Sequence, residues 1–164
     1  MMNKDDFIEE MRSTQRSLIK MIEMVPEDRL NWAPAEGFMT IAQLLKHVSS
    51  NWCIVRMMVT DSWPDSSPEE MAEAMKLENL PSCSKAEALE EMKKDLDNAV
   101  AYIEREISEQ DFFSRSVSAP WNWTGEIWKA VLMAKDHQVN HKMQLHLYLK
   151  LLKLPVNTQT LYGV

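Results

Sequence analysis

Two histidines, His137 and His141, stand four residues apart in a segment with helical periodicity. At about 100° per residue they lie on one face of the helix, one turn apart, so both imidazoles can reach one metal ion. Zinc proteases use this spacing with a glutamate after the first histidine, but Gln138 occupies that place here, so the protease motif is absent. The spacing alone also arises by chance on helix surfaces.

The neighbours of this pair favour a metal site over chance. The periodicity places both histidines on the inward seam of the helix, in the core, where an unpartnered imidazole is costly to bury. The seam positions one and two turns earlier are Ala134 and Ala130. Small side chains there leave space beside the histidines, whereas leucines would fill a bundle without a cavity.

His47 is the candidate third ligand, at the edge of the inward stripe of another predicted helix. Bundles build metal sites from side chains on facing helices. Three imidazoles leave coordination positions open, as catalytic sites do. The alternative is a histidine at the core edge that bonds to a carbonyl. His146 lies nine residues after His137, about 180° around the helix, and is expected at the surface or in an interface.

Three polar residues could orient the imidazoles: Asn51, one turn after His47, and Asn140 and Gln144 near the pair. Metal-bound histidines usually donate their other N–H group to such a partner. Ordinary polar packing is the alternative for each of the three.

Other constellations predict less chemistry. Cys53 lies six residues after His47 and off its face, so a nucleophile–base pair is not expected. With Cys83 it makes no disulfide framework, and both are expected to be reduced thiols. Four tryptophans could line a pocket or belong to the core: Trp52, Trp121, Trp123 and Trp128.

Four amphipathic segments must position these residues. They cover about Lys4–Met24, Thr40–Thr60, Ser84–Ile107 and Thr124–Leu152. Thr40 with Gln43, and Ser84 with Glu87, have the form of capping boxes. The long links at 26–39, 61–83 and 112–123 are typical of crossovers. The prediction is an all-α four-helix bundle with long crossover connections, forming one domain over residues 1–164.

Composition agrees with this fold and excludes some partners. The chain is 45% hydrophobic and 26% charged, with only three Gly and 13 Met, which favours long helices. A net charge of −7 without a basic run argues against nucleic acid. The sequence contains neither an apolar stretch of membrane-spanning length nor the apolar region of a signal peptide. We therefore expect a cytoplasmic protein without a membrane or nucleic-acid partner.

The sequence resembles the DinB/YfiT-like family of metalloenzymes over nearly its whole length. The similar segments are Pro26-Glu27 through Leu30-Asn31-Trp32-Ala33-Pro34, Thr40 through His47, His137-Gln138-Val139-Asn140-His141-Lys142-Met143-Gln144-Leu145, Tyr148 through Leu152, and Leu161-Tyr162-Gly163. Their order and spacing together are specific. One departure is Lys153-Leu154-Pro155, where that family usually has glycine after the last helix, and this leaves the helix end open.

The resemblance implies a divalent metal held by His47, His137 and His141, most often nickel or zinc, with iron as a further option. It also implies a homodimer and, for some members, a thiol-dependent transferase or isomerase that uses a small thiol. The leading hypothesis is a metal-dependent transferase or hydrolase acting on a small molecule. Its rivals are a non-catalytic metal-binding or stress-related structural protein and a metal-free bundle.

Overall fold

The computed structural model describes residues 2–163, so both end residues of the predicted domain lie outside the described residues. Its long helical segments are α1 (Lys4–Glu23), α2 (Ile41–Val48) followed by α3 (Cys53–Thr60), α5 (Lys85–Glu106) and α7 (Ile127–Leu151). The shorter elements are α4 (Pro68–Ala74), α6 (Glu109–Ser114), α8 (Thr158–Tyr162), β1 (Ser116–Ala119), β2 (Trp123–Glu126) and the 3-10 turns Glu27–Arg29 and Leu77–Asn79.

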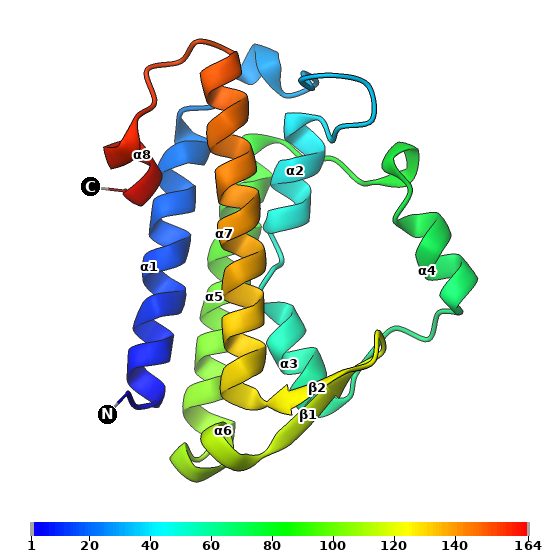
Figure 1. The fold of residues 1–164 in the computed structure, drawn as a ribbon, viewed down its shortest axis with the longest axis vertical. Coiled ribbons are helices and arrows are strands. Elements are labelled where there is room, and N and C mark those ends of the chain that lie inside the picture. Colours follow the sequence, from blue (N-terminus) through cyan, green and yellow to red (C-terminus); the bar gives the residue numbers. More distant parts are fainter. Residues whose placement is uncertain (1, 164) are drawn as a thin grey trace.

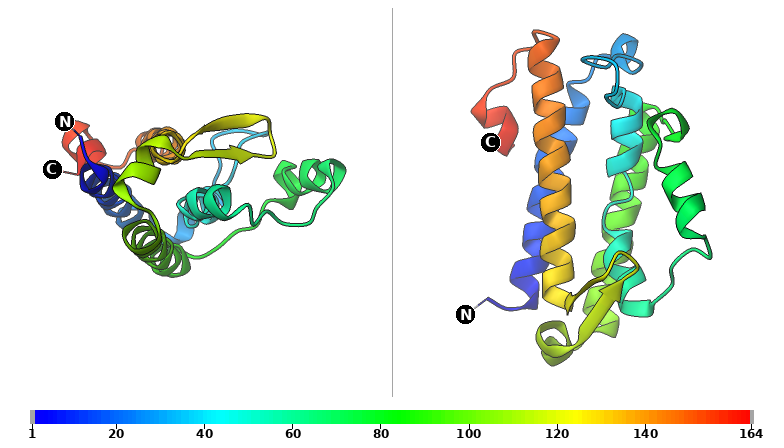
Figure 2. Two further views of the ribbon diagram at one scale, coloured as in Figure 1. Left: turned by 90° about the horizontal axis from the view of Figure 1, so that it is seen from below. Right: turned by 45° about the vertical axis from the view of Figure 1, so that its right-hand side comes forward.

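The long helices form a four-membered bundle (Figure 1). Helix α1 contacts α5 and α7, and α2 and α3 also contact α5 and α7, so the elements close a ring. The chain runs along α1, returns along α2 and α3, and crosses over through α4 before α5 runs in the same direction as α3 (Figures 1 and 2). The predicted all-α fold is confirmed, apart from one small two-stranded sheet.

The helix starts follow from local side-chain caps. Thr40 with Gln43, and Ser84 with Glu87, form the predicted capping boxes at α2 and α5. Each side chain satisfies a backbone N–H group that the first turn leaves without an intrahelical partner. Helix α2, which carries His47, is therefore fixed at its beginning.

The segment from Thr40 to Thr60 is not one helix, contrary to prediction, because it breaks between Val48 and Cys53. Two groups outside the α-helical ladder stabilise the break. A carboxylate oxygen of Asp95 accepts the Trp52 N–H at 2.5 Å, and the Ser49 hydroxyl donates to Glu91 at 2.5 Å. Both carboxylates come from α5, so the break depends on a tertiary contact that helical periodicity does not encode.

The predicted loop at 112–123 contains structure of its own. Helix α6 covers its start, and β1 pairs antiparallel with β2, Val117 facing Gly125. Asn122 turns the hairpin with φ of 61°, a left-handed conformation that asparagine tolerates better than most residues. Because Trp123–Glu126 is a strand, α7 begins at Ile127 rather than near Thr124.

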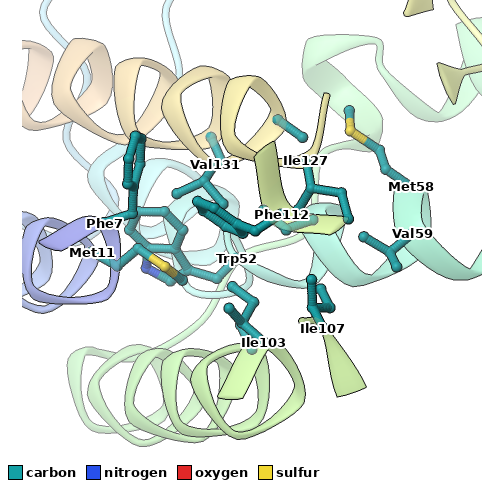
Figure 3. Close-up of a cluster of buried hydrophobic side chains, with 14 of the residues drawn as sticks. Phe7, Met11, Trp52, Met58, Val59, Ile103, Ile107, Phe112, Ile127 and Val131 are labelled. Atoms are coloured by element: carbon teal, nitrogen blue, oxygen red, sulfur yellow. The ribbon is translucent and has the colours of Figure 1, made fainter. Parts of the chain in front are cut away.

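Two clusters of buried side chains fill the bundle. One surrounds Phe7, Phe112 and Trp52 at the end where α1 starts (Figure 3). The other surrounds Leu45 and Tyr148, towards the end of α7. Trp52 is fully buried, and Trp123 and Trp128 pack against the first cluster, so the core interpretation holds for these three tryptophans.

The end of α7 accounts for the missing glycine. Lys153 follows the helix with φ of 61°, the left-handed conformation that glycine usually supplies after a helix. The Leu154 N–H donates to the Leu149 carbonyl at 3.0 Å, as in a Schellman motif. The helix therefore ends in a Schellman motif, in which Lys153 has the left-handed conformation that glycine usually adopts. Within residues 2–163, no helix has the length and apolar character that a bilayer span requires.

Candidate metal centre

Three histidines from two elements meet on the side of the bundle where α2 faces α7. His47 is in the last turn of α2, and His137 and His141 are one turn apart on α7. The Nε2 atom of His137 lies 3.1 Å from Nε2 of His47 and 3.2 Å from Nε2 of His141. The structure therefore brings together all three residues that the sequence singled out.

Asn51 fixes the orientation and tautomer of His137. Its amide Nδ2 donates to the Ala134 carbonyl at 3.0 Å, so its Oδ1 is the atom that lies 2.8 Å from Nδ1 of His137. An amide oxygen only accepts, so Nδ1 of His137 carries the proton. Nε2 of His137 therefore presents its lone pair to the centre of the cluster.

A second relay fixes His141. The Tyr148 hydroxyl donates to the Met39 carbonyl at 3.2 Å and accepts from Nε2 of Gln144 at 2.9 Å. The Gln144 Oε1 atom then accepts from Nδ1 of His141 at 2.9 Å. Nε2 of His141 is left with its lone pair towards the same point as Nε2 of His137.

The two bare Nε2 atoms define what the cluster can hold. Two acceptors 3.2 Å apart repel each other unless a cation or a proton lies between them. Ligand nitrogens about 2.05 Å from a tetrahedral metal ion lie roughly 3.3 Å from one another. The two separations from His137, 3.1 and 3.2 Å, are close to that value, and all three ligand atoms lie within 4.8 Å of one another, so the cluster could hold a metal ion.

The electrostatics of the cluster favour neutral imidazoles, which is the form that binds metal. Partial burial, followed by the positive charges that His141 and His47 would carry, lowers the pKa of His137 to about 4. Burial, and then the charge of His141, also lowers the pKa of His47.

The cluster lies in an open groove and not in the core, contrary to prediction. His137 is exposed, and His47 and His141 are half-buried. The burial of this face changes along α7. Ala130 and Ala134 face the interior, whereas the histidines lie near solvent, where α7 meets α2. Solvent access leaves the outer side of the cluster open to further ligands.

Of the three polar residues predicted to orient the imidazoles, two contact them and one does not. Asn51 and Gln144 contact the imidazoles, as anticipated, whereas Asn140 is exposed and makes no side-chain hydrogen bond within residues 2–163. His146 is remote from the cluster, but it is 7% exposed and so is not a surface residue of this chain. It lines a hollow together with Thr158 and Leu161 of α8.

A cavity of about 810 Å³ opens beside His47 and His137. Ala134 contributes to its wall, in agreement with the space predicted beside the histidines. Trp121 lines the cavity, in agreement with the interpretation of this tryptophan as part of a pocket. Trp63 also lines the cavity, although it was not among the tryptophans expected there. The rings of Trp63 and Trp121 pack edge to face, with centroids 5.4 Å apart. The signal for Trp63 would have been its place at the start of the long crossover.

Neither cysteine is disulfide-bonded, as predicted. Cys53 lines the cavity, but burial, and then the charge of Asp95, raises the pKa of its thiol. Burial, followed by the charge of Glu91, raises the pKa of Cys83 to about 11. Both thiols are therefore protonated near neutral pH and are poor nucleophiles.

Comparison with known proteins agrees with this architecture. A DinB-like protein from Bacillus cereus ATCC 10987 superposes with a TM-score of 0.74 at 14% identity, covering 94% of this chain and 96% of that chain. A DinB-like protein from Bacillus subtilis superposes with a TM-score of 0.62 at 17% identity, covering 92% and 95%. These likenesses concern the fold.

A search of curated proteins finds no match. The sequence pattern of the DinB superfamily, in contrast, matches residues 10–145, which include all three clustered histidines. That match spans most of the chain, and the protein is a member of the DinB superfamily.

Proposed function

We propose that the protein is a metal-dependent enzyme in which His47, His137 and His141 bind one divalent ion, nickel or zinc in the first place. The observation that carries this proposal is the pair of bare Nε2 atoms, 3.2 Å apart, that Asn51 and Gln144 aim at one point. A bundle with no use for a cation would gain by turning one of these imidazoles away. The donor set of three nitrogens suits zinc, nickel, copper or iron.

The reaction class is a transfer or hydrolysis on a small molecule. Three protein ligands leave open positions, and a bound ion of this kind polarises an oxygen or lowers the pKa of a water or a thiol. The chain holds the ligands and directs a substrate towards them from the cavity. Among the described residues, no aspartate, glutamate, lysine or arginine lines that cavity, so no side-chain general base is positioned there.

This lining indicates from which side each reactant would approach the histidines. The nucleophile would enter as water or as a low-molecular-weight thiol from the solvent side, where His137 is exposed. Asn51 and Gln144 hold the imidazoles against rotation while the substrate binds. We also propose a homodimer, for which exposed Leu147 and Leu151 on α7 offer an apolar face.

A structural role for the ion is the competing function, since the ligands connect α2 to α7. The hydrophobic cluster around Leu45 and Tyr148, however, joins the same two helices without the histidines. We therefore expect the chelated protein to keep its helical circular-dichroism spectrum at 25 °C while it loses all thiol-transfer and hydrolytic activity towards a panel of model substrates. Loss of helicity on chelation, with no substrate turned over by the metal-loaded protein, would favour the structural role.

A further inference from the structure

The cavity beside the histidines has an unusual lining for an active site of small polar substrates. Its walls come from α3, α7, the α4 crossover and the hairpin tip. They are built mainly from apolar side chains: Ile54, Met57, Trp63, Met71, Met75, Trp121 and Met133. Four methionines give it a lining that adapts to ligand shape. At about 810 Å³ it has the size of a small-molecule site.

We propose that this cavity binds an uncharged molecule with a long alkyl or aromatic body, whose single polar group faces His47 and His137. The inference rests on the proposed function for the direction of that polar group. A molecule of this shape would place its apolar body between α3 and α4 and its reacting end at the metal ligands.

The charge of the lining sets the class of ligand. Among the described residues, the only ionisable side chains in the wall are His47, His137 and Cys53, and burial keeps that thiol protonated. An anionic body would therefore lose its hydration without meeting a cation. A small polar thiol would fit the solvent side of the histidines better than this apolar cavity. The cavity is then free to bind the second, apolar reactant.

Exposed side chains at the rim point to the same occupant. Met71 is 42% exposed, Met75 62% and Trp121 51%, and all three line the cavity. They come from two segments far apart in the sequence, α4 with the residue that follows it and the hairpin tip, which lie on the same side of the bundle (Figure 2). An apolar ligand would remove this surface from water, which is favourable in proportion to the area covered.

A second copy of the chain is the competing occupant. Two observations favour a small molecule: the cavity ends at the metal ligands, and its volume lies within the range of roughly 300–1,000 Å³ that such ligands occupy. A second copy would have to place a protruding side chain there and would block access to His47 from this side.

The test compares two hydroxamates on the zinc-loaded protein by calorimetry. Both carry the same metal-binding head, but octanohydroxamate adds six methylenes to acetohydroxamate. Each buried methylene strengthens binding roughly fourfold, so we expect octanohydroxamate to bind at least about 100-fold tighter. Met71→Asp should reduce that ratio at least about tenfold and leave acetohydroxamate unchanged. Met143→Asp, at an equally exposed methionine on α7, should preserve it.

The outcomes separate the two proposals. A ratio below about fivefold, or the same ratio in Met71→Asp and Met143→Asp, overturns the apolar cavity while zinc binding leaves the metal site intact. If zinc itself fails to bind, the proposed function is wrong. The cavity is then tested on the metal-free protein with the neutral dye prodan, whose emission should shift to the blue in the wild type and not in Met71→Asp. A change of molar mass in Met71→Asp, measured by light scattering, would assign the surface to a second copy.

Discussion

The Oδ1 atom of Asn51 lies 2.8 Å from Nδ1 of His137, and this contact joins the break between α2 and α3 to the middle of α7. Because Asn51 also donates to the Ala134 carbonyl, its amide has one orientation. The tautomer of His137 follows from that orientation, and so does the direction of its free lone pair. The break between the two helices therefore positions the side chain that orients His137.

The first prediction concerns the two residues that orient the imidazoles. Asn51→Ala and Gln144→Ala should each weaken zinc binding by about 10- to 100-fold, because they remove the partners that fix His137 and His141. Competition with a chromophoric chelator measures the affinity. Asn140→Ala is the matched control, because Asn140 is an exposed amide on α7, the helix that also carries Gln144. This variant should bind zinc as tightly as the wild type does. Equal affinities in all three variants would contradict the assigned relays.

Sequence reasoning succeeded where local chemistry decides the outcome. The caps at Thr40 and Ser84 and the helical spacing of His137 and His141 are encoded within a few residues, and the structure contains all of them. Spacing left His47 open between two interpretations, and its approach to His137 depends on how α2 packs against α7.

The failures occur where tertiary contacts compete with periodicity. Asp95 accepts the Trp52 N–H from another helix, so the break before Cys53 has no signal in the segment that contains it. The position of the histidines failed for a related reason. One helical face can run from core to solvent along a long helix, so sharing a seam with Ala134 did not place His137 in the core.

The second prediction concerns the pH dependence of stability. Burial raises the pKa of Asp95 from 3.8 to about 6, against the effect of the Trp52 and Cys53 N–H groups. A carboxyl group whose pKa is higher in the folded state stabilises the fold below its unfolded pKa, and that contribution is lost as the pH rises through the folded value. Between pH 4 and pH 7, wild-type stability should therefore fall relative to Asp95→Asn by up to about 3 kcal/mol.

Urea unfolding of both proteins at pH 4, 5, 6 and 7 measures this difference. The comparison cancels the other carboxylates, since both chains share them. A constant difference over the four pH values would show that Asp95 titrates in the folded state as it does in the unfolded chain.

The third prediction concerns the beginning of α2. Thr40→Ala should lower the free energy of unfolding by about 1 kcal/mol, because the Gln43 N–H loses its side-chain acceptor. Thr40→Ser, which retains the hydroxyl, should recover most of that loss. Thermal or urea unfolding of the two variants gives the measurement, and equal stabilities would show that the capping box does not contribute.

The fourth prediction is a gain in stability at the end of α7. Lys153 is exposed and has φ of 61°, so Lys153→Gly should raise the free energy of unfolding by about 1 kcal/mol through relief of the left-handed conformation. Lys150→Gly, three residues earlier and inside the helix, should lower it by about the same amount. Urea midpoints that move in the same direction for both variants would contradict the assigned helix end.

The number of metal ions that the histidine cluster binds tests the proposed metal centre most directly. Calorimetric titration of the metal-stripped protein with Zn²⁺, and separately with Ni²⁺, should give one bound ion per chain. His47→Ala, His137→Ala and His141→Ala should each weaken binding at least about 100-fold, whereas His146→Ala should bind as the wild type does. A wild-type protein that binds neither ion, or histidine variants that bind as tightly as the wild type, would contradict the account.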